Sequence, residues 1–159
     1  DKGCKKIMIL KDFRGISSII SRYNGYEKAL KEAGILIDKD LICDVNKVDH
    51  EHAKNGILEK INSNIEFDGI FATNDWMALG AIGALAEKSI RVPEDVKVVG
   101  FDGMSISAMT VPAITTINQN TEKMGEYAIE ILMDIITNKN NSLRNISIPV
   151  ELIKRKSTE

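Results

Sequence analysis

The stretch FATNDWMALGA, residues 71–81, decides the fold because a short apolar run passes through Asn74 and Asp75 directly into a small-residue apolar segment. Asn and Asp are common at helix N-caps, since their side chains accept hydrogen bonds from free backbone N–H groups. The stretch therefore predicts a β-strand that turns at once into an α-helix. It leaves open whether Asn74 and Asp75 only start that helix or also face a ligand.

On both sides of this stretch, short apolar runs alternate with longer segments of helical periodicity. We expect strands at residues 5–10, 40–45, 67–73, 95–101 and 114–117, helices at 18–34, 49–64, 75–88 and 120–139, and a closing strand or bent strand pair at 145–156. Asp49 is the expected N-cap of the second helix. Repeated strand–helix alternation predicts an α/β fold, with a parallel sheet and helices on both of its faces.

Polar residues follow three of the expected strands at the point where each strand ends. The segments are LKDFRG at 10–15, ATND at 72–75 and GFDG at 100–103. Ligands of parallel α/β sheets bind outside the carboxyl ends of the strands, so the three segments point to one edge of the sheet. None of them has the glycine pattern of a phosphate-binding loop.

Composition favours binding over catalysis. The chain has 159 residues, of which 43% are hydrophobic, and its formal net charge of -2 does not indicate a wholesale nucleic-acid binder. No apolar run approaches the roughly 20 residues of a membrane helix. No Ser lies in a GxSxG elbow, and no recognisable acid–base pair of carboxylates is present. We therefore expect no enzyme activity.

Neither a metal nor a cofactor is expected. His50 and His52 lie two residues apart, which is the wrong spacing for ligands on one helix face, and a solvated helix start is the simpler interpretation. Cys4 and Cys43 are isolated and do not form a CxxC pair. Two such cysteines favour a reduced, intracellular protein over a disulfide framework.

Several separated motifs resemble the lactose/galactose-repressor (LacI/GalR) family. They are FDGIFATNDWMALGAIGALAEKSIRVPEDVKVVGFDG at 67–103, VPAITTINQNTEKMGEYAIEILMDII at 111–136 and the closing ELIKRKST at 151–158. The segment RYNGYEKALKEAG at 22–34 is similar to that family's Arg-x-x-Gly-aromatic helix. The motifs agree in order and spacing and cover nearly the whole chain.

The resemblance implies a sugar- or small-molecule-responsive repressor that is cytoplasmic and dimeric. Full members carry an N-terminal helix-turn-helix, a hinge and a two-subdomain effector-binding body like that of periplasmic binding proteins. The chain is expected to be a fragment of that body, so operator DNA would be a partner only through the missing N-terminal domain. Residues 1–117 would form the C-terminal subdomain, residues 118–145 a helix that crosses to the missing subdomain, and residues 146–159 the returning strands.

The resemblance also implies a ligand site that contains Arg22, Asn74 and Asp102. Arg22 would fork onto ligand oxygens, although a surface Arg on a helix is usually only solvated. Asn74 would offer a donor and an acceptor, with Asp75 doing more of the capping; the alternative is that Asn74 only caps. Asp102 would accept from vicinal hydroxyls, or instead bind turn amides before Gly103, where the family more often has a second Asp.

Loops after the first two strands supply further candidates for the cleft. Asp12 and Phe13 follow the first strand, and Asn46 follows the second. An aromatic side chain such as Phe13 could stack on the face of a sugar.

The helix at 75–88 is apolar nearly all round, which implies burial on more than one side. The resemblance implies that one face meets a second subunit, whereas burial between the sheet and neighbouring helices is the alternative. The predicted interface residues are Trp76, Met77, Leu79, Gly80, Ala81, Ala84, Met104 and Met109. The helix at 121–137 would lack its usual cover, so we expect it to repack against its own domain or to dock onto another chain.

Two other classes remain open. A periplasmic sugar-binding protein of a transporter shares the fold and the FDG segment at 101–103, although the VPAITTI and KRKST segments weigh against it. A flavodoxin- or receiver-type domain is the third, and only LKDF and GFDG suggest its acidic pocket.

Overall fold

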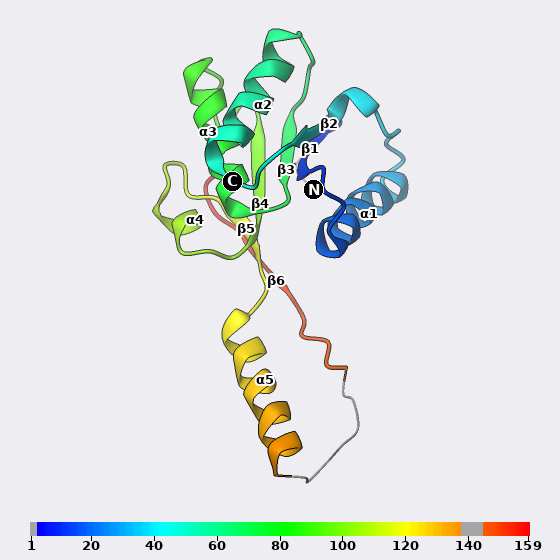
Figure 1. The fold of residues 1–159 in the computed structure, drawn as a ribbon. Coiled ribbons are helices and arrows are strands. Elements are labelled where there is room, and N and C mark those ends of the chain that lie inside the picture. Colours follow the sequence, from blue (N-terminus) through cyan, green and yellow to red (C-terminus); the bar gives the residue numbers. More distant parts are fainter. Residues whose placement is uncertain (1–2, 138–144) are drawn as a thin grey trace.

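The computed structural model describes residues 3–137 and 145–159, which build a six-stranded sheet in the order β2-β1-β3-β4-β5-β6 (Figure 1). The strands are β1 (Ile7–Asp12), β2 (Ile42–Val45), β3 (Gly69–Ala72), β4 (Lys97–Asp102), β5 (Thr115–Asn118) and β6 (Glu151–Ile153). Strands β1 to β5 pair in parallel, whereas β6 pairs antiparallel with β5. The predicted α/β class with a parallel sheet is confirmed.

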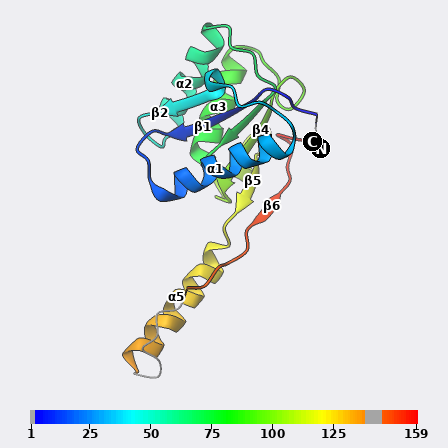
Figure 2. The ribbon, with the colours of Figure 1, turned by 90° about the vertical axis from the view of Figure 1, so that its right-hand side faces the viewer.

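Helices α1 (Ser17–Glu32), α2 (His50–Asn62) and α3 (Asp75–Glu87) cover the two faces of this sheet. The other helical elements are the 3-10 turn η1 (Lys39–Leu41), α4 (Ile106–Met109) and α5 (Thr121–Ile136). Side chains of β1 alternate between the faces: Met8 and Leu10 join the core under α2 and α3, while Ile9 packs with Tyr26 and Leu30 of α1. Figures 1 and 2 show α1 on the opposite side of the sheet from α2 and α3.

Helix α3 is buried within its own subunit, which corrects part of the predicted dimer interface. Met77, Ala81 and Ala84 are fully buried in the core that α2 shares. Gly80 lies against the α2 backbone, because a Cβ added there would lie 2.2 Å from the carbonyl oxygen of His50. The prediction that these four residues face a second subunit is therefore wrong, and burial between sheet and helices, the alternative, is what the structure has.

The other predicted interface residues are accessible to different degrees. Trp76 is 41% exposed and Met109 of α4 is 74% exposed. Leu79 and Met104 are half-buried, and Leu79 packs against the core. A second subunit at these four positions, on α3 and in the loop around α4, therefore stays a prediction.

Beyond β5 the chain leaves the sheet, and α5 projects away from it as an arm (Figures 1 and 2). No residue of α5 is buried, so the helix does not repack against its own domain as one of our two expectations had it. Its exposed large apolar residues are Met124, Ile129, Leu132, Met133, Ile135 and Ile136. Docking onto another chain stays a prediction. No described helix is both long enough and apolar enough to cross a membrane.

Candidate ligand-binding site

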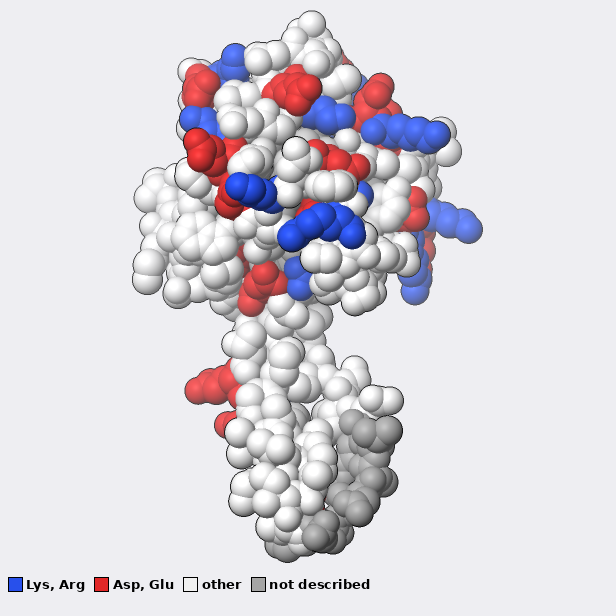
Figure 3. Space-filling view, in the orientation of Figure 1, with Lys and Arg blue, Asp and Glu red and all other residues white. Residues whose placement is uncertain are grey.

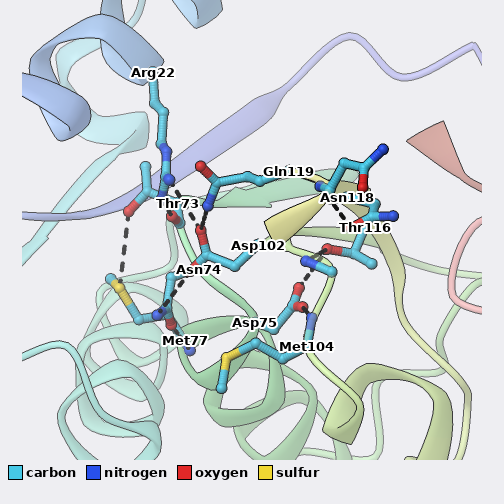
Figure 4. Close-up of polar contacts among 12 residues, drawn as sticks. Arg22, Thr73, Asn74, Asp75, Met77, Asp102, Met104, Thr116, Asn118 and Gln119 are labelled. Carbon is cyan, nitrogen blue, oxygen red and sulfur yellow. Dashed lines mark hydrogen bonds and ion pairs between the residues drawn. The ribbon is translucent and has the colours of Figure 1, made fainter. Parts of the chain in front are cut away.

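The candidate site lies at the carboxyl ends of β3, β4 and β5, beside the start of α3 (Figure 4). Asp102, the last residue of β4, is its centre. Its Oδ1 accepts hydrogen bonds from Arg22 Nη2 at 2.9 Å and from Gln119 Nε2 at 2.6 Å, and its Oδ2 faces Asn74 Nδ2 at 3.4 Å. The structure thus brings together Asn74 and Asp102, which the sequence predicted at one edge of the sheet, and Arg22, which the family resemblance placed with them.

Arg22 is held in place rather than solvated. Its Nη1 donates to the carbonyl oxygen of Thr73 at 2.5 Å, and its guanidinium lies 3.9 Å from the centre of the Phe101 ring. Stacking on an aromatic face and forked hydrogen bonding both suit the planar guanidinium group. The side chain that reaches from α1 across to β3 and β4 therefore has a defined orientation before any ligand arrives.

The turn that carries Asp102 is strained. Asp102 has φ 105°, a value that non-glycine residues rarely adopt, and Gly103 follows with φ 70°. A Cβ at Gly103 would lie 2.7 Å from Asn118 Oδ1, so the position where the family more often has Asp has no room for a side chain here. Strained backbone of this kind concentrates at functional sites, where the surrounding structure enforces it.

Asn74 and Asp75 divide their work differently from the prediction. Asn74 is the N-cap of α3, since its Oδ1 accepts from Met77 N at 3.0 Å, while its amide nitrogen faces Asp102. Asp75 does not cap: it is fully buried, and its carboxylate accepts from Thr116 Oγ1 at 2.6 Å and from Met104 N at 2.7 Å. Burial raises the pKa of Asp75 above its ordinary value.

The three remaining predicted ligand residues lie at the ends of β1 and β2. Asp12 is buried, and its carboxylate accepts from the backbone N and Nε of Arg14, which lower the pKa of Asp12. Asp12 is therefore occupied in fixing its own loop, and direct ligand contact by Asp12 is not supported. Phe13 and Asn46 are exposed and stay candidates.

Gln119 is the site residue that the sequence did not reveal. It follows β5 directly, at the same edge as Asn74 and Asp102, and this position was the only signal available. Gln119 and Arg22 also border a cavity of about 670 Å³ between α1 and the sheet, with Tyr26, Phe71 and Phe101 among its walls. Small-molecule sites commonly join such an apolar wall to a few fixed polar groups.

The arrangement is suited to binding a small polar ligand through hydrogen bonds. A carboxylate, two amides and a guanidinium converge, which together supply acceptors and donors for hydroxyl groups. Within residues 3–137 and 145–159, no group of three or more His, Cys, Asp or Glu side chains is placed to hold a metal ion.

Comparisons with known proteins agree with this architecture. Residues 1–158 match the family described as periplasmic binding protein-like domain. The chain is 36% identical over 163 residues to the HTH-type transcriptional repressor PurR of Histophilus somni strain 2336, which covers 100% of this chain and 47% of that protein. The CelR–cellobiose complex of a transcriptional regulator matches with TM-score 0.90 and 29% identity over 98% of this chain and 47% of that one. A sugar-binding LacI-family regulator from Escherichia coli complexed with phosphate matches with TM-score 0.88 and 29% identity over 98% and 55%.

These relatives confirm the resemblance to LacI-family regulators that the motifs indicated. They support a regulator over the periplasmic transport protein that the sequence left open. The chain spans about half the length of the curated relatives it matches.

Proposed function

This chain belongs to the periplasmic binding protein-like domain family, and we propose that it is the effector-binding part of a cytoplasmic, sugar- or small-molecule-responsive transcriptional repressor, not an enzyme. The observation that carries the proposal is the carboxylate of Asp102. Three side chains from separate parts of the fold, Arg22, Asn74 and Gln119, converge on it. Similarity to named transcriptional regulators supports the same conclusion.

The effector that fits this chemistry is a small polyhydroxylated molecule, with a sugar as the first candidate. Vicinal hydroxyls can donate to the carboxylate of Asp102 and accept from the Arg22 guanidinium and the amides of Asn74 and Gln119. Phe13 is 59% exposed at the end of β1, where its ring can cover the apolar face of a sugar. Asn46 lies exposed after β2 on the same edge.

The regulatory step would be a population shift. An effector that binds one arrangement of the whole protein better than another changes operator affinity by the same coupling free energy. In this proposal operator DNA is contacted by a DNA-binding domain of the whole protein, outside residues 1–159. Residues 1–117 act as one effector-binding subdomain, residues 118–145 as the crossing segment with α5 (Thr121–Ile136) in it, and residues 146–159 as the returning segment. Residues 138–144 of the crossing segment lie outside the described residues.

Binding is tested by thermal-shift measurements with cellobiose, D-glucose, D-ribose and hypoxanthine as probes. We expect at least one sugar to raise the melting temperature, because a ligand that binds only the native state stabilises it. Asp102→Asn should weaken that binding by about 10-fold or more, since hydrogen bonds to charged groups contribute about 1.5–3 kcal/mol. Asp95→Asn, which removes an exposed carboxylate away from the site, is the matched control. An unchanged affinity in Asp102→Asn would reject the site.

A second copy of the chain is the proposed partner of the surface around α4. Met109 and Trp76 are exposed there, Leu79 and Met104 are partly accessible, and Val111 is 94% exposed. Exposed apolar residues that cluster on a surface mark interaction sites. Sedimentation should show that Met109→Glu weakens dimerisation, while Leu36→Glu, at an even more exposed apolar residue after α1, has no effect. Equal effects of the two changes would contradict the interface.

A further inference from the structure

The backbone that follows Asp102 is held by hydrogen bonds to two buried side chains, Asp75 and Thr116. Met104 N donates to Asp75 Oδ2 at 2.7 Å, and Gly103 N donates to Thr116 Oγ1 at 3.3 Å. The Thr116 hydroxyl in turn donates to Asp75 Oδ1 at 2.6 Å (Figure 4). Both amides of the Gly103–Met104 segment are therefore bound to one linked pair of side chains.

The fold leaves space for the Asp75 side chain to make these hydrogen bonds. Asp75 is the first residue of α3, directly after the cap residue Asn74, and its carboxylate crosses β4 to reach Thr116 on β5. A Cβ at Gly100 of β4 would lie 2.2 Å from Asp75 Oδ1, so only glycine permits the crossing. A fully buried carboxylate with two donors at a helix N-terminus is a specific arrangement, because a buried charge without such partners is costly.

The fastened segment continues into α4. The carbonyl oxygen of Met104 accepts from Ser107 Oγ at 2.5 Å and from Ser107 N at 3.0 Å. Ser107 is fully buried, and its Oγ also accepts from Arg155 Nη1 at 3.0 Å. Asp102 in the site and Met109 at the surface thus lie at the two ends of one segment that Asp75 holds near its start.

We propose that Asp75 is a positioning residue, whose buried carboxylate fixes Gly103–Met104 and thereby sets both the strained Asp102 turn in the candidate site and α4 at the surface. The role of this arrangement in effector binding rests on the proposed function. Loss of the Asp75 carboxylate would free the segment from Asp102 to Met109. A ligand bound at Asp102 and a partner bound at Met109 would then both act on the position of this segment. Asn74 and Asp75 are adjacent in sequence and both orient Asp102. Asn74 contacts its side chain, and Asp75 holds the backbone that follows it.

The test is amide hydrogen exchange of the 159-residue chain without ligand, followed by NMR. Asp75→Asn keeps the size of the side chain but removes its negative charge and one acceptor oxygen, so the hydrogen bonds that Met104 N and Thr116 Oγ1 donate to a charged carboxylate are weakened. We expect exchange at Met104 and Ser107 to rise by about 10-fold or more relative to Leu10 of β1, since a bond of this kind contributes about 1.5–3 kcal/mol. Thr116→Val replaces the hydroxyl with a methyl group. It should raise exchange at Gly103, whose amide loses its acceptor, and at Met104, because the carboxylate of Asp75 loses the donor that holds it.

Thr116→Ser is the matched control, because it retains the hydroxyl and should leave exchange at Gly103 and Met104 within about 2-fold of the native rate. An equal rise at all amides, or unchanged exchange at Met104 in both Asp75→Asn and Thr116→Val, would overturn the proposal, because Asp75 would then be only a stability residue. If Asp75→Asn fails to fold, Thr116→Val and Thr116→Ser decide. Exchange is read without effector, so failure of the sugar-binding proposal is seen separately in the thermal-shift panel.

Discussion

Helices α3 and α5 differ in what they contact, although both were predicted from the sequence as helices with many apolar residues. Most of α3 is buried, with Gly80 set against the α2 backbone, whereas no residue of α5 is buried and Ile129 is 61% exposed. Small residues allow α3 to approach its neighbours closely, while the bulky apolar residues of α5 lie away from the sheet. Periodicity therefore indicates that a helix forms, but the location of a partner decides whether its apolar face is buried.

Truncation of one leucine in each helix tests this difference most strongly. Leu85→Ala removes a fully buried side chain of α3 and should lower the free energy of unfolding by about 2–5 kcal/mol through lost burial and a new cavity. Leu132→Ala, at a half-exposed position of α5, should change it by less than about 0.5 kcal/mol. Urea denaturation followed by circular dichroism measures both. A large loss in Leu132→Ala would show that α5 is packed in solution.

Two Gly→Ala substitutions, one in α3 and one in α5, should change stability by smaller amounts and in opposite directions. Gly80→Ala places a Cβ against the His50 carbonyl and should destabilise the sheet region by about 1–3 kcal/mol. Gly125 of α5 has nothing within 4 Å of an added Cβ. Gly125→Ala should therefore favour the helix by about 1 kcal/mol, because alanine has the higher helix propensity. Thermal denaturation and the helical circular-dichroism signal follow the two changes, and a stabilising Gly80→Ala would contradict the tight contact.

An ion pair of the sheet region gives the smallest of the three effects on stability. Figure 3 shows acidic and basic side chains spread over the sheet region, and a few acidic side chains on the visible upper part of the arm. The exposed Arg91–Asp95 pair lowers the pKa of Asp95 to about 2 from its ordinary value of 3.8. Because the folded pKa is depressed, the stability from this pair is present above pH 3.8 and is lost as the pH falls towards about 2.

An NMR titration of the Asp95 carboxyl group should give this low pKa in the native chain. Arg91→Gln should raise it towards its ordinary value, since the guanidinium that favours the charged form is removed, while the backbone N of residue 91 still donates to the carboxylate. The control is Lys28→Gln on α1, whose side chain pairs with Glu32 instead. A pKa of Asp95 that is the same with and without Arg91 would show that the pair does not form in solution.

The fold was predictable because each strand and helix has its own period and its own end signals. The edge of the sheet that holds Asn74 and Asp102 followed from parallel topology, and Arg22 followed from the resemblance. Asn74 combines the capping role with the predicted contact in the site, whereas Asp75, the expected cap, is buried, because the space above Gly100 admits its carboxylate. The space at Gly100 exists because β4, β5 and the start of α3 meet there, and a local sequence pattern does not predict contacts between such distant elements.

Two other differences have the same origin. Gln119 carries no chemical mark in the sequence, and its role arises from the distance between the end of β5 and Asp102. The burial of Met77 and Ala84 depends on α2, which approaches α3 from a separate part of the chain. Sequence patterns therefore predicted elements and edges well, and contacts between distant elements poorly.

The pairing of β5 with β6 makes residues 119–150 an insertion in the topological sense. The chain leaves the sheet at Asn118 and re-enters it at Glu151, and these two residues are partners in the antiparallel register. Antiparallel neighbours can be joined by a two-residue turn. Residues 119–150 can thus be replaced by Asn-Gly without altering the strand order, at the loss of Gln119 from the candidate site, and the Asn118–Glu151 pair is a natural place to insert another domain.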